Sequence, residues 1–159
     1  TIKGHKPVFF ESIIKLNEIV YKRAIKLIID LCGDLNGKHI SVFGVAFKKD
    51  TSDIRESRVI DLICELIKQN AQISIVDPLA ISETKKLLGS KVSYPVTIED
   101  ALKDSDICIL GLAYEEFSQI VEKIDLMRNP IILDLCDHPI QTMLKNVRNN
   151  NIIYRGILW

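Results

Sequence analysis

Apolar residues recur at two different spacings along the chain, and the change of spacing separates the expected elements. Over residues 8–32 they lie three or four positions apart, as in Phe9, Ile13 and Leu16. This spacing predicts a helix of about seven turns at 3.6 residues per turn. Residues 33–37 (GDLNG) then end the helix, because glycine adopts the left-handed conformation that helix ends and turns require.

The expected helix carries more apolar surface than a single stripe. Phe10, Ile14, Ile25 and Ile29 widen its apolar face. Two interpretations stay open: the helix lies across its own domain, or it also packs against another domain or subunit.

Five short runs with a different pattern follow the helix, and we expect each of them to be a strand. They cover residues 38–45, 71–76, 106–112, 130–135 and 152–157. Their residues are apolar almost throughout rather than at every second position. That pattern is typical of parallel strands buried on both faces of a sheet.

Helical patterns separate the strands. They cover residues 57–70, 82–88, 97–103, 114–124 and 140–147, the fourth of them broken. Ser57 and Thr97 are the expected N-caps of the first and third. Strands alternating with helices predict an α/β fold: a Rossmann-like, doubly wound parallel sheet of about five strands, preceded by one long helix. We expect one boundary, near Gly37, between residues 1–36 and residues 37–159.

The charge balance excludes some classes of partner. Of 159 residues, 21 are Lys or Arg and 21 are Asp or Glu, so no net field attracts nucleic acid or an anionic membrane. No apolar run approaches the roughly 18 residues that span a bilayer. The first residues lack the pattern of a secretory signal. Because the chain starts at Thr1 rather than Met, we expect a piece of a longer protein.

The four cysteines predict a reduced protein without a metal site. Cys32, Cys64 and Cys108 lie within helix-like or strand-like runs, where buried free thiols are common. No C-x-x-C pair and no cysteine–histidine cluster has zinc-ligand spacing. Free thiols persist in a reducing compartment, so we expect the protein to be cytoplasmic. Cys136 follows the fourth strand and is considered with the site residues.

Residues 43–57 (FGVAFKKDTSDIRES) carry the densest chemistry of the chain. Ten of them, 48–57, hold two lysines, an arginine, three acids and three hydroxyls between a strand-like and a helix-like run. Anions bind at such junctions in α/β folds, since the first N–H groups of a helix are unpaired. We expect an anion site with Lys48, Lys49 and Arg55 as its cations. The three acids also suffice to neutralise them, which leaves a solvated loop as the alternative.

The same junction has one glycine where a dinucleotide-binding loop has three. The usual pattern is G-x-G-x-x-G, and residues 44–49 read GVAFKK. We therefore expect no backbone cradle for a pyrophosphate, and lysine charge has to act in place of glycine amides. This argues against NAD binding by this chain alone.

Residues 44–57 resemble a block of the UDP-glucose/GDP-mannose dehydrogenase family, whose C-terminal domain carries G-x-A-F-K-x-x-T-x-D-x-R-x-S there. Residues 75–78 (IVDP), after the second strand, extend the match. Residues 12–30 resemble the second half of the family's central dimerisation helix. Residues 112–117 are similar to its T-E-W-x-x-F segment, and residues 132–134 to the strand before its D-G-R segment. The resemblance covers nearly the whole chain.

The resemblance implies roles for individual residues. Phe47 and Lys48 correspond to residues at the nucleotide-sugar substrate, and Arg55 to an arginine that reaches NAD bound mainly by an N-terminal domain. Residues 37–159 are then the UDP-sugar-binding domain. Residues 1–36 are a remnant of the middle domain, through whose helix a homodimer forms. The family oxidises the C6 hydroxyl of the sugar to a carboxylate in two NAD-dependent steps, through a thioester on a cysteine.

Two departures limit what the chain does by itself. It has neither the G-x-G-x-x-G domain nor the G-G-S-C-F-P-K-D-like segment with the nucleophile, so we expect no catalytic residue in it. The D-G-R segment reads Asp134-Leu135-Cys136, so Cys136 replaces an arginine that contacts substrate. Cys136 is therefore the third substrate-binding candidate, and the identity of the sugar stays open. With His138 as its one basic neighbour, we expect an ordinary thiol.

Other residues have two interpretations each. Asp77 suits a ribose hydroxyl or the cap of a turn. Tyr114 and Phe117 suit a uracil pocket or packing. His138 is expected to be a turn residue, and His39 lies on a strand without a site around it.

Three functions compete. The first is the nucleotide-sugar-binding domain of an NAD-dependent UDP-sugar 6-dehydrogenase, of the UDP-glucose or UDP-N-acetylhexosamine type. The second is a non-catalytic α/β assembly module that has lost ligand binding, which Cys136 favours. The third is an unrelated Rossmann-like module for a free nucleotide. The block that contains Lys48 and Arg55 favours the first.

Overall fold

The computed structural model describes residues 19, 22–145, 147 and 151–156. Residues 22–32 are helical. The elements that follow are β1 (His39–Phe43), α2 (Arg58–Lys68), β2 (Gln72–Val76), α3 (Ile81–Leu88), η1 (Gly89–Lys91), α4 (Ile98–Leu102), β3 (Ile107–Leu110), η2 (Glu115–Leu126), β4 (Ile131–Asp134), α5 (Ile140–Leu144) and β5 (Ile153–Gly156). The predicted alternation of strands and helices is confirmed, with each strand somewhat shorter than its apolar run.

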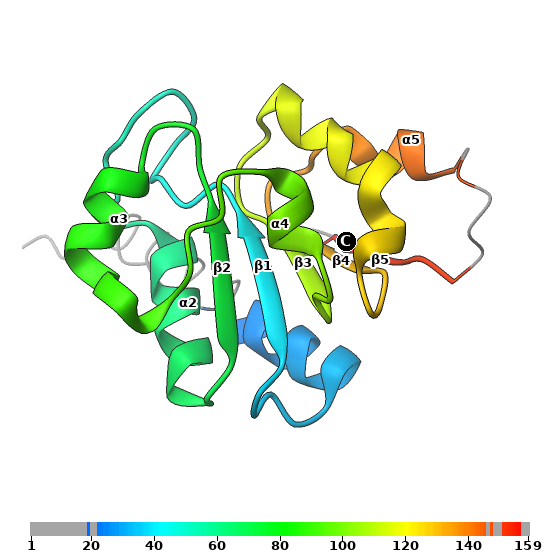
Figure 1. Cartoon of the computed structure of the whole chain (residues 1–159), viewed down its shortest axis with the longest axis horizontal. Helices are drawn as coiled ribbons and strands as arrows, with labels where there is room; N and C mark the ends of the chain where they lie inside the picture. Colours follow the sequence, from blue (N-terminus) through cyan, green and yellow to red (C-terminus); the bar gives the residue numbers. More distant parts are fainter. Residues whose placement is uncertain (1–18, 20–21, 146, 148–150, 157–159) are drawn as a thin grey trace, which may run out of the picture.

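The five strands form one parallel sheet in the order β2-β1-β3-β4-β5, with helices on both faces (Figure 1). The doubly wound α/β fold is thereby confirmed. The sequence left the strand order open. Beside these strands, Ser93 and Ser74 form an isolated parallel bridge.

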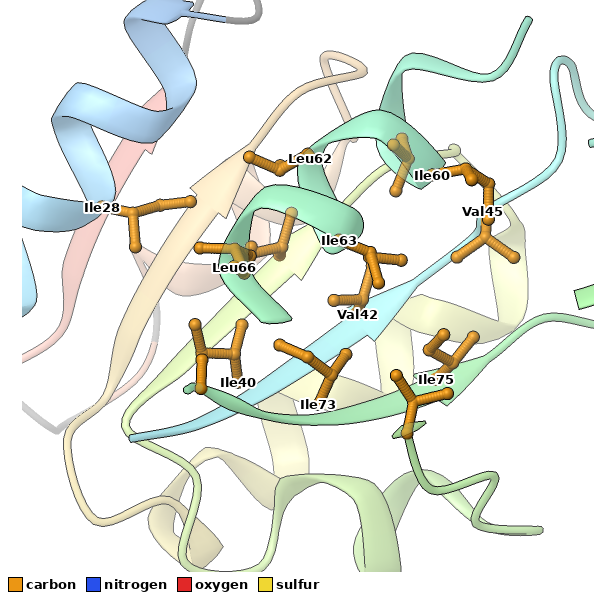
Figure 2. Packing of buried hydrophobic residues seen from close by; sticks show 14 of the residues in the cluster. Ile28, Ile40, Val42, Val45, Ile60, Leu62, Ile63, Leu66, Ile73 and Ile75 are labelled. Carbon is orange, nitrogen blue, oxygen red and sulfur yellow. The ribbon is translucent and has the colours of Figure 1, made fainter. Parts of the chain in front are cut away.

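One face of the sheet packs against α2 and the helical residues 22–32. Ile40 and Val42 of β1 point to this face, together with Ile73 of β2, and lie under Ile63 and Leu66 of α2 (Figure 2). All five side chains are at most 3% exposed. Helix α2 begins where the sequence predicted, because the Ser57 hydroxyl accepts the Ile60 N–H as its N-cap.

The opposite face packs against α4, η2 and α5. Phe43, the neighbour of Val42 on β1, points to this side, as successive strand residues must. Thr97 caps α4 by accepting the Asp100 N–H at 3.1 Å. The broken helix expected over residues 114–124 is the 3₁₀ segment η2.

Helical residues 22–32 belong to the core of the sheet domain. Ala24 and Ile28 are 2% and 0% exposed, whereas Ile29 is 40% exposed. The described part of the helix thus lies across its own domain, and a further partner for its outer face stays a prediction. The rest of the predicted helix, residues 8–18, 20 and 21, lies outside the described residues. Among the helices of the described residues, none is long and apolar enough to cross a membrane.

Candidate functional site

The carboxyl ends of β1 and β3 are the place where the direction of winding reverses. From β1 the chain crosses to β2 on one side and then returns beyond β1 to β3 on the other. Ligands bind in the crevice outside the strand ends at such a reversal. Residues 44–57 follow β1 and residues 111–114 follow β3, so these two segments border the expected crevice (Figure 1).

Gly44 and Gly111 let the two segments touch. A Cβ on Gly111 would lie 2.2 Å from the Gly44 carbonyl oxygen, and one on Gly44 would lie 2.6 Å from the Leu112 Cβ. Gly44 also has a φ of +83°, which residues with a Cβ rarely adopt. The one glycine of the loop is therefore required by the packing of the chain on itself.

The buried carboxylate of Asp77 holds the base of the loop. Its Oδ2 accepts the N–H groups of Val45 and Ala46 at 2.7 and 3.3 Å. Its Oδ1 accepts those of Leu79 and Ala80 at 2.9 and 2.7 Å. Both oxygens are engaged by the backbone, so the structure favours the capping interpretation of Asp77 over the ribose contact.

Two further hydrogen bonds close the loop. The Ser57 hydroxyl donates to the Val45 carbonyl at 2.7 Å, which ties the start of α2 to the end of β1. The Phe47 N–H donates to the Asp53 carbonyl at 2.7 Å. We call residues 47–53 the lobe, because this bond joins its two ends beyond the carboxyl end of β1.

Lys48 offers an available positive charge on the lobe. Its side chain is exposed, and none of the ion pairs within the described part of the chain involves it. Phe47 beside it is 57% exposed. Lys49 differs, since its ammonium lies 5.6 Å from the centroid of the Tyr114 ring. The sequence did not distinguish the two lysines, and the structure does.

Arg55 is held in place by Asp53. Its Nε and Nη2 donate to the two oxygens of that carboxylate at 2.9 and 2.7 Å. These bonds to Arg55 lower the pKa of Asp53 to about 2, and the same pairing raises the pKa of Arg55. The arginine side chain stays 85% exposed and borders a hollow of about 510 Å³ between α2 and α3. Asp53 thus binds one edge of the guanidinium and orients the side chain, while the rest of the side chain stays open to solvent.

Cys136 lies in a network of hydrogen bonds around the buried Asp134 at the end of β4. Its N–H donates to Asp134 Oδ1 at 2.8 Å, while Oδ2 accepts the His138 N–H and the Tyr154 hydroxyl. Burial, and then the Asp134 charge, raise the pKa of the thiol. The expected ordinary thiol agrees with this environment. A neutral thiol also brings none of the charge that an arginine brings to a substrate.

Tyr114 connects this network to the lobe. Its carbonyl accepts the Nε2–H of His138 at 2.8 Å, and its hydroxyl accepts the Asp50 N–H at 3.0 Å. Tyr114 is 7% exposed and Phe117 is fully buried, so Phe117 packs in the core and does not line a pocket. His138 is a buried turn residue, as predicted, since its Nδ1 accepts the Ile140 N–H. The hydroxyl contact to Asp50 joins residues 64 apart, and no pattern in the sequence predicts it.

A second hollow, of about 480 Å³, borders the edge strand β2. His39 Nε2 lies 2.7 Å from the Ser74 hydroxyl, which lies 2.8 Å from the Ser93 hydroxyl. Ser93 in turn donates to the Ile73 carbonyl. Each hydroxyl is satisfied by a neighbour, which indicates a structural role and agrees with the interpretation of His39 as a strand residue.

The predicted site residues therefore divide into two places. Phe47, Lys48 and Arg55 share one loop after β1, and Cys136 lies after β4, linked to that loop through His138 and Tyr114. No group of His, Cys, Asp and Glu that would hold a metal ion occurs among the described residues. The roles of these residues toward a ligand stay predictions.

Comparison with known proteins places this arrangement in a family. The model of the UDP-glucose/GDP-mannose dehydrogenase family, UDP binding domain, matches residues 41–138. UDP-glucose 6-dehydrogenase TuaD of Bacillus subtilis is 30% identical over 133 residues, which are 82% of this chain and 29% of that protein. UDP-glucose 6-dehydrogenase AglM of Haloferax volcanii is 30% identical over 132 residues, 83% of this chain and 30% of that protein.

Solved structures show the same fold. A UDP-glucose dehydrogenase from Pyrobaculum islandicum superposes with a TM-score of 0.73 at 22% identity, over 94% of this chain and 32% of that one. GDP-mannose dehydrogenase from Pseudomonas aeruginosa gives 0.71 at 20% identity, over 97% and 35%. The chain spans 29% and 30% of the length of the two curated relatives. It belongs to the UDP-glucose/GDP-mannose dehydrogenase family, of which it contains the UDP binding domain.

Proposed function

We propose that this chain holds the nucleotide end of a UDP-sugar in an NAD-dependent UDP-sugar 6-dehydrogenase. The observation that carries the proposal is Lys48, an exposed lysine without an ion pair among the described residues, on a lobe that the fold ties down at the winding reversal. An ammonium there pairs with a diphosphate without losing a partner inside the protein. Phe47 beside it offers an aromatic surface to the same ligand.

Within this proposal the chain contributes positioning. Binding energy from the diphosphate fixes the sugar relative to the groups that oxidise it, which lowers the entropic part of the barrier. Cys136, with its neutral thiol, contributes polarity and size at the substrate rather than charge. In this proposal, the thioester-forming cysteine and the N-terminal domain that binds NAD belong to parts of the enzyme outside this sequence. The oxidation at C6 is a property proposed for the whole enzyme.

Within the described residues, NAD fits this chain at one contact, Arg55. The amides of Val45 and Ala46, which in a dinucleotide loop are free for a pyrophosphate, are bound by Asp77. Arg55 fits an anionic group of NAD, since its guanidinium is exposed and already oriented by Asp53. NAD supplies the hydride acceptor when another domain binds it, and Arg55 holds it from this side.

The proposal extends to assembly and location. Ile29 is 40% exposed within helical residues 22–32, which suits a homodimer through the helix predicted over residues 8–32. The free cysteines suit the cytoplasm. The balanced charge and the charged surface suit neither nucleic acid nor membrane partners.

Titration of the 159-residue chain with UDP, UDP-glucose and NAD, followed by amide chemical shifts, tests the proposal. We expect UDP to shift the resonances of the lobe, and NAD alone to shift few. Lys48→Ala weakens UDP binding about tenfold or more, the effect of losing a hydrogen bond to a charged group. Lys103→Ala is the matched control, since Lys103 is exposed and lies before the amino end of β3, at the end of the strands opposite to the lobe. No shift at millimolar UDP would instead support the non-binding assembly module.

A further inference from the structure

The hydroxyl of Tyr114 touches the lobe at its turn. It accepts the Asp50 N–H at 3.0 Å, and Asp50 has a φ of +63°, which a residue with a Cβ adopts only at some cost in energy. A conformation of this kind persists only where neighbouring groups hold it. Tyr114 is the group that holds it here.

Tyr114 is itself fixed from two sides. Its ring packs edge-on against Phe117 with centroids 5.5 Å apart, and Phe117 packs in the same way against Phe43 of β1 at 5.4 Å. Its carbonyl accepts the His138 ring N–H, and His138 is in turn bound to Asp134. Because Tyr114 is held in place by residues at the strand ends, its hydroxyl holds the lobe at a fixed position relative to the sheet.

Lys48 lies between two fixed points of the lobe. The Phe47 N–H is bound by the Asp53 carbonyl on one side, and the Asp50 N–H is bound by Tyr114 on the other. The Lys49 ammonium over the Tyr114 ring adds a third attachment. The backbone at Lys48 is thus held while its side chain is free, which is the arrangement that prepares a lysine for an anionic ligand at little entropic cost.

We propose that Tyr114 is a positioning residue for Lys48, and that its hydroxyl keeps the lobe in the conformation that binds the diphosphate. The inference rests on the proposed function, since it concerns the same site. It assigns Tyr114 a role other than the uracil contact considered from sequence, because 93% of its surface is covered and its hydroxyl is already bound to the lobe.

Tyr114→Phe in the full chain tests the inference, because it removes the hydroxyl and keeps the ring under Lys49. We expect UDP to bind about fivefold more weakly, as for the loss of one hydrogen bond. Tyr94→Phe is the matched control: its hydroxyl also bonds to the backbone, although as a donor to the Gly89 and Thr84 carbonyls, and the Lys85 ammonium lies 5.2 Å from its ring centroid. We expect Tyr94→Phe to bind UDP as the wild type does.

A double-mutant cycle separates positioning from direct contact. With Lys48→Met already present, Tyr114→Phe is expected to change UDP affinity little, since its effect passes through the lysine. An equal loss in both backgrounds overturns the inference, as does a Tyr114→Phe variant that binds UDP like the wild type.

Hydrogen exchange of the wild-type chain gives a measurement that needs no variant and no ligand. The Asp50 amide is expected to be protected, and an Asp50 amide that exchanges at the rate of an open loop overturns the inference. If the wild-type chain binds no UDP, the proposed function fails and this inference fails with it. If it binds UDP and Tyr114→Phe binds equally well, only this inference fails.

Discussion

Replacing Asp77 by Asn tests the central claim about the loop, namely that its base is held by a carboxylate rather than left open for a ligand. Asp77 accepts four backbone N–H groups, two on each oxygen, and is 5% exposed. Asparagine keeps one oxygen and replaces the other by an NH₂ group, which cannot accept. Whichever way the amide turns, two of the four N–H groups then face a donor.

The expected loss follows from those two N–H groups. A buried donor left without an acceptor costs about 1–3 kcal/mol, so the free energy of unfolding should fall by about 2–4 kcal/mol once water replaces part of what is lost. A domain of ordinary stability has about 5–15 kcal/mol in total, so the change is large enough to measure. Asp77→Ala removes all four acceptor contacts and should lose more.

Urea unfolding of the wild type, Asp77→Asn and Asp34→Asn measures the effect. Asp34 is an exposed carboxylate that accepts one N–H, from Asn36 at 3.1 Å, and an asparagine oxygen can still accept it. The control should therefore lie within about 0.5 kcal/mol of the wild type. If Asp77→Asn is as stable as Asp34→Asn but binds UDP more weakly, the carboxylate serves the ligand and the structural reasoning is wrong.

Two further predictions concern the same loop. Gly44→Ala should lower the free energy of unfolding by about 2 kcal/mol or more beyond the loss in Gly37→Ala. Both glycines have a positive φ, but at Gly44 the new Cβ would lie 2.8 Å from the Leu112 backbone nitrogen, whereas at Gly37 it would meet nothing within 4 Å. Equal losses in thermal unfolding would exclude close approach as the cause. NMR titration should give Asp53 a pKa of about 2 in the wild type and a value nearer 3.8 in Arg55→Ala, and an unchanged value would show that another group stabilises the carboxylate. Since the folded-state pKa is the lower one, any stability from this pair is present above pH 3.8 and is lost as the pH falls through about 2.

Much of the fold was predictable because its signals are local. Strands β1 and β3 are buried on both faces, so their apolar runs stand out against the amphipathic patterns of the helices. Ser57 and Thr97 cap helices three residues before the N–H groups they accept, so residue type and spacing suffice to find them. The order of the three inner strands was not predictable, since β1, β3 and β4 all carry a nearly continuous apolar pattern.

The candidate site was less predictable because its decisive contacts join distant residues. Asp77 looks the same in sequence whether its oxygens meet a ribose or the amides of residues 45 and 46, which lie 32 and 31 positions earlier. Tyr114 reaches Asp50 across 64 positions, and no residue type marks such a contact beforehand. Lys48 and Lys49 are neighbours of one type, and only the Tyr114 ring distinguishes them.

These contacts also explain why the loop can dispense with the glycines of a dinucleotide site. Glycines bring backbone amides close to a pyrophosphate, but here Asp77 occupies the amides of Val45 and Ala46, and Tyr114 occupies that of Asp50. Beside its backbone, the loop offers an anion the charge of an exposed side chain, that of Lys48. The same bonds that withdraw the backbone from a ligand fix the backbone that carries the lysine.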